Sequence, residues 1–349
     1  MSELGTKVSA KTGLEAAAAV PNSAPEPTTP GSLSFAFFKS GPSLMEGPAF
    51  RGAAMCFVVF SILIDGFFSI ETLAAVLLVS AQLGIVATGV GLLLTAREFD
   101  LSVEAVFALA GGMTVVGINI GLVPTFTVAA VLTGAGIIGA LNGYLVTRLK
   151  VHSLLVTLGT MLICHAVVAA LMQSQKMQLN GYYWSFGLFD FRLFGAIPIS
   201  VVWMVMLVLL AALGVGRTRF GNWIYATGAD PLAAYNLGVP VTAVRLQSFA
   251  IASLMAALAG VMSIVQTGNM ALGAGDALAL EALLAALVGG VRLSDGRGTV
   301  SGIICAVLAL KMSQQALVMV GGDPVWYRTG VMVALVLITF RFLQQRQEV

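Results

Sequence analysis

Charged residues are scarce in this sequence. Asp, Glu, Lys and Arg make up only 10% of the 349 residues, whereas 58% are hydrophobic, and the mean hydropathy is +0.96. A soluble globular domain carries roughly 25% charged residues and has no series of apolar runs about 20 residues long. The composition therefore excludes a soluble globular protein and predicts an all-α integral membrane protein.

Basic patches, metal-ligand spacings and catalytic constellations are also missing. The basic residues are scattered singly, without interleaved aromatics, so no nucleic-acid partner is expected. The cysteines Cys56, Cys164 and Cys305 lie inside apolar runs and are interpreted as small buried hydrophobes. His152 and His165 have no carboxylate or thiol at ligand spacing. We therefore expect no metal, no cofactor and no enzymatic activity.

The first 48 residues lack any periodic apolar pattern. Their stretch VPNSAPEPTTPGS concentrates Pro, Ser and Thr, and such a composition cannot bury enough apolar surface to offset the entropy of ordering. The sequence predicts a disordered cytoplasmic tail over 1–48 and a transmembrane domain over 49–349.

Long apolar segments fill the rest of the chain. Most are near the roughly 20 residues that a helix needs to cross about 30 Å of hydrocarbon, so about ten transmembrane helices are expected. The segments are 52–70, 72–95, 101–121, 123–146, 153–172, 196–214, 246–265, 277–290, 299–320 and 326–343. The eighth is short for a straight span and predicts a broken or half helix.

Ten crossings place both termini on the same side, and the basic residues indicate which side. Lys176, Arg192 and Arg328 would lie outside and Lys311 within the ninth segment. Because Lys and Arg collect in cytoplasmic loops, both termini are predicted to be cytoplasmic. The residues on the inner side would be Lys7, Lys11, Lys39, Arg51, Arg97, Arg148, Lys150, Arg217, Arg219, Arg245, Arg292, Arg297, Arg341 and Arg346.

Aromatic residues gather in the predicted outer loop 173–195. Rings of this kind sit at the level of the lipid headgroups, so they are interpreted as membrane anchors, with substrate stacking as the less favoured alternative. The residues are Tyr182, Tyr183, Trp184 and Phe186, next to Gly181.

The stretch REFDLSVEA, residues 97–105, places four ionisable groups between two apolar segments. Arg97 fits the positive-inside pattern. Asp100 is expected to cap a helix that begins at Leu101, and Glu104 would lie in the first turn, where a carboxylate complements the helix dipole. Glu104 is the charge that this interpretation explains least.

The longest inner loop, 217–245, contains the sequence GADPLAAYNLGVP. Asp230 is a good N-cap, Pro231 suits the first helical position, and Gly238 with Pro240 ends the helix after about two turns. A helix this short is marginal alone in water, so it is either a well-capped connector or a docking helix. In the docking case Ala233 and Ala234 would allow close approach while Tyr235, Asn236 and Leu237 make contacts.

Four stretches in order resemble the permease subunits of bacterial ABC importers for monosaccharides, the ribose, xylose and autoinducer-2 group. They are EFDLSVEAVFALAGG, similar to the pattern G-x-I-D-L-S-V-G; NGYLVTRLKVHSLLVTLGT; GNWIYATGADPLAAYNLGVPV; and ALEALLAALVGGVRLSDGRGTVSG. The resemblance covers residues 50–343. Two departures are Glu104, where the family usually has Gly, and Glu281, where it often has Asp.

The resemblance implies a permease fold in the bacterial inner membrane and several partners. These are a cytoplasmic ATP-binding subunit, a periplasmic or extracellular sugar-binding protein, and a second permease, either a copy of this chain or a paralogue. Asp230 through Gly238 would be the coupling helix that enters a cleft of the ATPase. The chain has no GxxxxGK[ST] loop, so the energy would come from that separate subunit.

Polar groups in or beside the apolar segments are candidates for the translocation path of an uncharged, hydroxyl-rich solute. They are Asp100, Ser102, Glu104, Asn142, Thr157 and Glu281, with Thr160, Asn269 and Gln314 as further candidates. Each can also serve helix packing, and for Glu281 both roles stay open. The alternative function is an ion-coupled secondary transporter in which Glu104 and Glu281 couple protons or sodium.

Overall fold

The computed structural model describes residues 48–337 apart from 175–177, 180–186, 188, 194, 196, 270–272, 274, 294, 324, 328, 332, 335 and 336. All of these residues belong to one compact unit, Pro42–Val349. The predicted tail lies outside the described residues, except for Pro48, which begins the first helix. The aromatic residues of the 173–195 loop named above also lie outside them.

Helices make up most of the described chain. The long ones are α3 (Ile70–Thr95), α4 (Ser102–Asn119), α5 (Pro124–Leu149), α6 (Ser153–Ser174), α7 (Ile199–Arg217), α10 (Val241–Thr267) and α12 (Val300–Met319). Shorter ones are α2 (Pro48–Leu63), α8 (Arg219–Ala229), α9 (Pro231–Asn236) and α11 (Leu278–Val288). Strands β1 (Arg192–Leu193) and β2 (Ile197–Pro198) form a small antiparallel hairpin in which Arg192 pairs with Pro198.

Seven of the described helices are long and apolar enough to cross a membrane, and two shorter apolar helices, α2 and α11, accompany them. The expected number of about ten crossings is therefore not confirmed. The tenth predicted segment, 326–343, lies largely outside the described residues. The expectation of a short eighth segment is confirmed, because α11 has only 11 residues.

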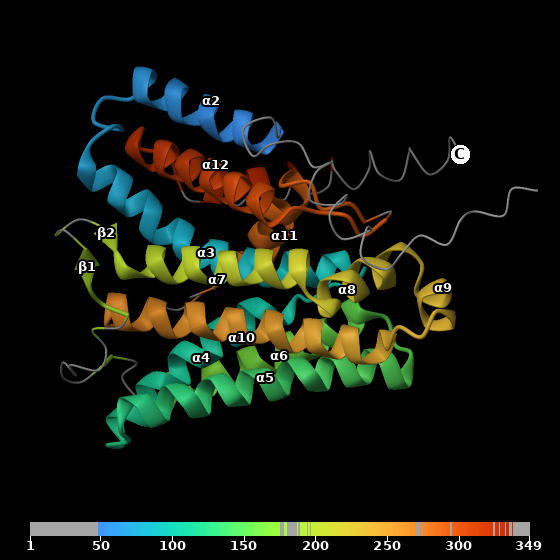
Figure 1. Cartoon of the computed structure of the whole chain (residues 1–349). Coiled ribbons are helices and arrows are strands. Elements are labelled where there is room, and N and C mark those ends of the chain that lie inside the picture. Colours follow the sequence, from blue (N-terminus) through green and yellow to red (C-terminus); the bar gives the residue numbers. More distant parts are fainter. Residues whose placement is uncertain are drawn as a thin grey trace, which may run out of the picture. The chain divides into compact units, whose positions relative to one another are not determined.

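The long helices run back and forth between two ends of the bundle (Figure 1). The hairpin end carries β1 and β2, the end of α4, where Asn119 donates to the backbone oxygen of Gln178, and the end of α10. The α9 end carries α8, α9, the end of α3 and the turn 291–298 that precedes α12. Residues at one end are therefore separated from those at the other by the length of a membrane span.

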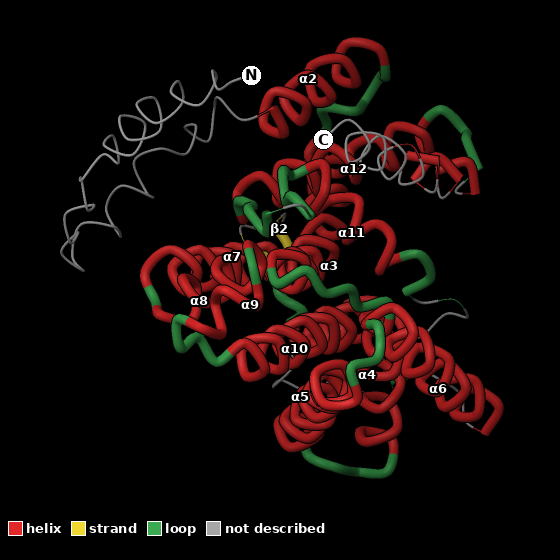
Figure 2. Tube along the Cα trace, turned by 90° about the vertical axis from the view of Figure 1, so that its right-hand side faces the viewer, coloured by secondary structure: helices red, strands yellow, loops and turns green. Residues whose placement is uncertain are grey.

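Three helices form the centre of the bundle. α10 packs against α3, α4 and α5, and 72% of the apolar window of α4 is buried, compared with 17% for α6. α5, α6 and α7 lie at the periphery, and Figure 2 shows α10 between α5 and α3. The close crossings depend on small residues: a side chain at Gly260 of α10 would collide with the Phe107 carbonyl of α4, and one at Gly139 of α5 with the Phe249 carbonyl.

Candidate functional site

The short helix α9 forms as its residues predict. Asp230 lies in the extended region (φ −152°, ψ 105°) and its Oδ1 accepts the backbone N–H groups of Leu232 and Ala233, at 2.9 and 3.0 Å. Pro231 occupies the first helical position, and Gly238 adopts a left-handed φ of 83° after the helix ends. The prediction of a two-turn helix capped at both ends is confirmed.

The surface of α9 is unusually apolar for a segment outside the long helices. Leu232, Tyr235 and Leu237 are 71%, 69% and 84% exposed. Ala233 and Asn236 are exposed as well. Ala234, in contrast, is only 3% exposed and packs against this chain, which corrects the expectation that both alanines face a partner. The side chains available for docking are therefore those of Leu232, Ala233, Tyr235, Asn236 and Leu237.

A second helix, α8, holds α9 against the bundle. Thr218 caps it by accepting the Gly221 N–H at 3.3 Å, and the Tyr225 hydroxyl donates to the Gly298 carbonyl at 3.0 Å. Gly228 lies directly against the Thr95 carbonyl at the end of α3, where a side chain would not fit. Burial raises the pKa of Tyr225, so its hydroxyl stays protonated and keeps donating. The base of α9 is thereby tied to α3 and to the 291–298 turn.

Five of the predicted path residues come together where α4, α5 and α6 meet. The Ser102 hydroxyl donates to Asp100 Oδ1 and accepts from the Asn142 amide at 3.0 Å. Asn142 in turn accepts the Thr160 hydroxyl at 2.6 Å. Asn142 and Ser102 are fully buried. The result is a chain of hydrogen bonds that crosses three helices, and we call Asp100, Ser102, Asn142, Thr157 and Thr160 the α4–α6 network.

The backbone before α4 is held by the first turns of α6. Ser153 Oγ accepts the Phe99 N–H, and Thr157 Oγ1 accepts the Leu101 N–H, both at 3.2 Å. The helix begins at Ser102 rather than Leu101, and Asp100 accepts the Ser102 N–H at 2.8 Å. Asp100 therefore lies one position before the N-cap residue Leu101 and caps α4 through the Ser102 N–H.

One atom of the network has no partner. Asp100 Oδ2 is buried and makes no hydrogen bond among the described residues. Burial raises the pKa of this carboxyl to about 6, although the hydrogen bonds from Ser102 act in the opposite direction. Asp100 is consequently a carboxyl that can carry a proton at mildly acidic pH.

Glu104 has a role that its own helix does not reveal. Its carboxyl lies within hydrogen-bonding reach of the backbone N–H groups of Ala277 and Ala279 at the start of α11, with the Asp276 carboxylate nearby. The Glu104 carbonyl lies close to Gly275. α11 has no capping side chain of its own, and Ala277 at its N-cap has a left-handed φ of 65°. Glu104 is therefore placed to cap α11 from a different helix.

Glu281 also faces another helix. The Lys311 ammonium of α12 contacts Glu281 Oε2 at 2.5 Å and Gln314 Oε1 at 2.8 Å, and it lies 5.6 Å from the centre of the Tyr327 ring. Both ionised side chains are 8% exposed. Of the two roles left open for Glu281, this geometry matches the contact between helices. The sequence analysis named no partner for Lys311. A single Lys in an apolar helix nevertheless indicates that an acidic side chain lies near it in the fold.

The remaining candidates are apart from the network. Asn269 is exposed at the hairpin end, where its backbone oxygen accepts the Thr267 hydroxyl at 3.0 Å. Glu104 and Glu281 belong to α11 contacts instead. The structure thus groups the predicted residues into the α4–α6 network, two polar contacts of α11, and the α9 surface.

Together these features define a polytopic helical membrane protein with polar contacts between its helices and one capped helix outside the bundle. The chain matches the family described as "Branched-chain amino acid transport system / permease component" over residues 72–340, and it belongs to that family. It is therefore a transport permease component that crosses the membrane several times.

Two relatives refine this placement. The chain is 31% identical over 291 residues to the fructose import permease protein FrcC of Rhizobium meliloti, covering 80% of each chain. It is 30% identical over 305 residues to the autoinducer 2 import system permease protein LsrC of Yersinia pseudotuberculosis, covering 84% of each. The resemblance stated from the four sequence stretches is confirmed.

Proposed function

We propose that this chain is the membrane-spanning permease subunit of an ABC importer that moves a sugar or a related small polar solute, driven by ATP hydrolysis in a separate cytoplasmic subunit. The names of the two relatives support a small hydroxyl-rich solute. Membership of the family supports an ATPase and a substrate-binding protein as partners, and we propose a second permease copy or paralogue beside them.

The observation that carries the ATPase coupling is the surface of α9. A six-residue helix is not stable by itself, yet this one is capped by Asp230, anchored through α8, and presents Leu232, Tyr235 and Leu237 to the surroundings. Apolar side chains on a short exposed helix suit insertion into a groove of another protein. Because the base of α9 is tied to α3, displacement of α9 would be passed to the centre of the bundle.

The distribution of basic residues supports an orientation with the α9 end in the cytoplasm and, with an even number of crossings, both termini there too. Arg192 belongs to the hairpin end. The α9 end carries Arg97, Arg148, Lys150, Arg217, Arg219, Arg245, Arg292 and Arg297. The substrate-binding protein would then meet the hairpin end.

The α4–α6 network supports a polar path near these helices. Hydroxyl, amide and carboxyl groups in an apolar bundle can replace water around a sugar hydroxyl without binding it tightly. Asp100 is the group best placed for this role, because one of its oxygens is buried and has no partner among the residues that the structure describes. Ser102, Asn142 and Thr157 would act with it.

An ion-coupled secondary transporter is less well supported. That alternative needs Glu104 and Glu281 as coupling carboxylates. Glu281 is engaged by Lys311, and Glu104 lies against the start of α11, so both carboxylates have partners within the protein.

The test is a change on the exposed face of α9. We expect Leu237→Arg to abolish co-purification of the ATPase and uptake while leaving membrane insertion intact, because an 84% exposed side chain contributes little to the fold of this chain. Ala234→Arg is a poor probe, since Ala234 is buried within the chain.

Val320→Arg is the matched control, because Val320 is 64% exposed at the end of α12, on the opposite side of the bundle. It should retain the ATPase. If Leu237→Arg retains both the ATPase and uptake, or if the purified chain transports in liposomes on an ion gradient alone, the proposed function is wrong.

A further inference from the structure

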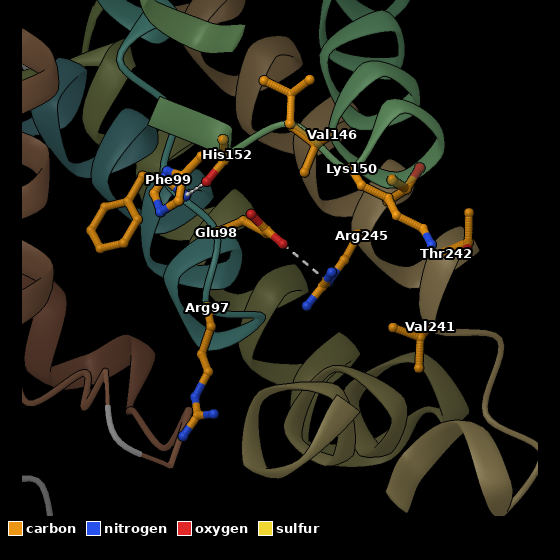
Figure 3. A pocket seen from close by; sticks show the side chains of 12 residues that line it. Arg97, Glu98, Phe99, Val146, Lys150, His152, Val241, Thr242 and Arg245 are labelled. Carbon is orange, nitrogen blue, oxygen red and sulfur yellow. Dashed lines mark hydrogen bonds and ion pairs between the residues drawn. The ribbon is translucent and has the colours of Figure 1, made fainter. Parts of the chain in front are cut away.

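A cavity of about 550 Å³ opens at the α9 end of the bundle (Figure 3). Three segments enclose it: the turn between α3 and α4, the turn between α5 and α6, and the first turns of α10. Its volume lies within the roughly 300–1,000 Å³ of small-molecule sites. Lys150, His152 and Thr242 line it and are exposed, so the cavity is accessible from this end.

The cavity lies one helical turn from the α4–α6 network. On α5, the lining residue Val146 follows Asn142 by four positions. On α6, the lining residue Ser153 precedes Thr157 by four positions. Residues four apart on a helix lie on the same face, about one turn apart along the axis. Two helices therefore lead from the wall of the cavity directly to the network.

The turn 97–101 separates the cavity from the network. Phe99 lines the cavity, and the next residue, Asp100, belongs to the network. Beyond the turn, Ser102 and Asn142 are fully buried. A solute that passes along the network to the α9 end must therefore displace this turn.

Two kinds of contact fasten the turn to its neighbours. On one side, Phe99 and Leu101 donate their backbone N–H groups to hydroxyl oxygens of α6, both at 3.2 Å. On the other side, Glu98 faces Arg245 of α10, whose Nε lies 3.1 Å from Glu98 Oε1 (Figure 3). That Nε has no hydrogen-bond geometry to any described residue, so the pair is held by the attraction of opposite charges.

The Glu98–Arg245 pair can separate more easily than an ion pair in the interior. Both side chains line the cavity, and that of Arg245 is 24% exposed. Water in the cavity can solvate the two charges when they part, whereas a fully enclosed pair would leave each charge uncompensated. None of the contacts of the turn requires a helix to unfold when it opens.

The lining also suits an uncharged solute that is rich in hydroxyl groups. Glu98 offers acceptor oxygens and Arg245 offers donors, while Thr147, Ser153 and Thr242 contribute hydroxyls that can do both. A sugar hydroxyl likewise donates and accepts.

The end of α3 connects the turn to α9. A side chain at Gly228 of α8 would collide with the Thr95 carbonyl, and Gly296 lies against the same carbonyl. Because these backbones are in direct contact, α8 cannot move far without moving the end of α3. α9 follows α8 after Asp230, and the turn 97–101 begins two residues after Thr95.

We propose that this cavity is the mouth of the solute path at the α9 end, that the turn 97–101 is the gate between the cavity and the α4–α6 network, and that the Glu98–Arg245 pair keeps the gate closed. The proposal rests on the proposed function, since it uses that path and the coupling through α9. Arg97 extends away from the pair and out of the cavity, so it takes no part in closing the gate (Figure 3).

The experiment measures how fast a thiol in the network reacts with 2-hydroxyethyl methanethiosulfonate, a water-soluble and uncharged reagent. Ser102→Cys is the reporter, in the purified full-length chain in nanodiscs. The native cysteines are removed by Cys56→Ala, Cys164→Ala and Cys305→Ala. Because Ser102 is fully buried, labelling should be slow. Glu98→Gln or Arg245→Gln should raise its rate about tenfold, the equivalent of about 1.4 kcal/mol in the opening equilibrium.

Three controls separate opening of the gate from other effects. Arg148→Gln removes an exposed charge at the same end that does not line the cavity, and it should leave the rate unchanged. Exchange of the two charges, Glu98→Arg with Arg245→Glu, should slow the labelling again. Ala316→Cys, packed between α12 and α2, reports general loosening of the fold and should stay unreactive in every variant.

Thr242→Trp tests the route of the reagent. Thr242 is exposed and lines the cavity, so a Trp side chain there should obstruct the mouth and slow the labelling of Ser102→Cys in the Glu98→Gln chain. Ala243→Trp is the matched control, because Ala243 is exposed beside it but does not line the cavity. It should leave the rate unchanged.

The proposal is overturned if Glu98→Gln and Arg245→Gln both leave the rate unchanged, if Ala316→Cys becomes reactive together with Ser102→Cys, or if Thr242→Trp and Ala243→Trp act alike. If Glu98→Gln does not assemble, Arg245→Gln and the charge-exchanged chain decide. The labelling needs neither the ATPase nor the solute. Its failure is therefore distinct from a failure of the Leu237→Arg experiment, which tests the proposed function.

Discussion

At the scale of single residues, the buried contact between Glu281 and Lys311 gives a direct prediction about stability. Two ionised groups within apolar helices are costly to desolvate, and each is tolerated because the other is present. Gln314 and the Tyr327 ring complete the surroundings of the ammonium. The pair joins α11 to α12, so its removal should lower the stability of the fold more than it changes transport of the solute.

We expect Lys311→Met to lower the free energy of unfolding by about 3–5 kcal/mol, because it leaves the Glu281 carboxylate buried without a cation. The double variant Glu281→Gln with Lys311→Met should recover most of that loss, since no charge is then left unpaired. Denaturation in mixed micelles measures both. Additive losses in the double variant would show that the two residues do not depend on each other.

Asp100 gives a prediction about pH. Because burial raises its pKa to about 6, the folded chain keeps a proton between about pH 4 and 6 that the unfolded chain has lost. Stability should therefore fall as the pH rises through this range and stay level above it. A shift of about 2 pH units corresponds to about 3 kcal/mol. Asp100→Asn should lack this component.

The measurement is the unfolding midpoint of the wild type and Asp100→Asn from pH 4 to 8. The difference between the two chains is the informative quantity, since other groups titrate in both. Asp190→Asn, at an exposed aspartate near the hairpin, should follow the wild type. A constant difference between Asp100→Asn and the wild type would contradict the raised pKa.

Local patterns in the sequence predicted those residue roles whose partners are near in the chain. Asp230 was predicted correctly because its acceptor role needs only the next three residues. The roles of Glu104 and Lys311 were not predicted. The residues that Glu104 approaches lie 173 or more positions away in the sequence, and Glu281 lies 30 positions from Lys311, so no helical period links them. A lone charge in an apolar segment indicates that a partner exists, but its position depends on how the helices pack.

At the scale of elements, α11 is the helix whose ends most need support. It has 11 residues, its N-cap residue Ala277 offers no side-chain acceptor, and the Glu104 carboxyl of α4 lies where it can supply one. We expect Glu104→Ala to lower the free energy of unfolding by about 1 kcal/mol, the usual worth of an N-cap. Glu104→Gln keeps an acceptor oxygen and should lose less.

Uptake in cells separates this capping role from a role in ion coupling. If Glu104 only caps α11, Glu104→Gln should transport nearly as well as the wild type over a range of pH. A complete loss of uptake in Glu104→Gln, with normal assembly, would assign the carboxylate itself to transport.

Element boundaries show which parts of the sequence carry local signals. α9 was predicted because Pro, Gly and a capping Asp mark both of its ends. α8 was missed, since the stretch RFGNWIYATGA is less apolar than a membrane span and its packing glycine, Gly228, makes contact with α3. α10 begins five residues before the predicted segment 246–265, because Val241 to Arg245 continue the helix beyond the apolar run.

At the scale of the whole molecule, the two ends of the bundle differ in charge, and this difference fixes the expected direction of the chain in the membrane. Basic residues near the α9 end would be costly to translocate, so that end should stay in the cytoplasm. Every functional assignment above that involves an ATPase depends on this orientation, because ATP hydrolysis takes place on the cytoplasmic side.

Single cysteines test the orientation directly. In a background with Cys56→Ala, Cys164→Ala and Cys305→Ala, Asp190→Cys at the hairpin end should react with a membrane-impermeant maleimide in intact spheroplasts. Asn222→Cys, exposed on α8, should react only after the membrane is opened. The reversed pattern would place α9 outside and separate it from any cytoplasmic ATPase, and labelling of both positions in sealed cells would mean that the α9 end is not confined to one side.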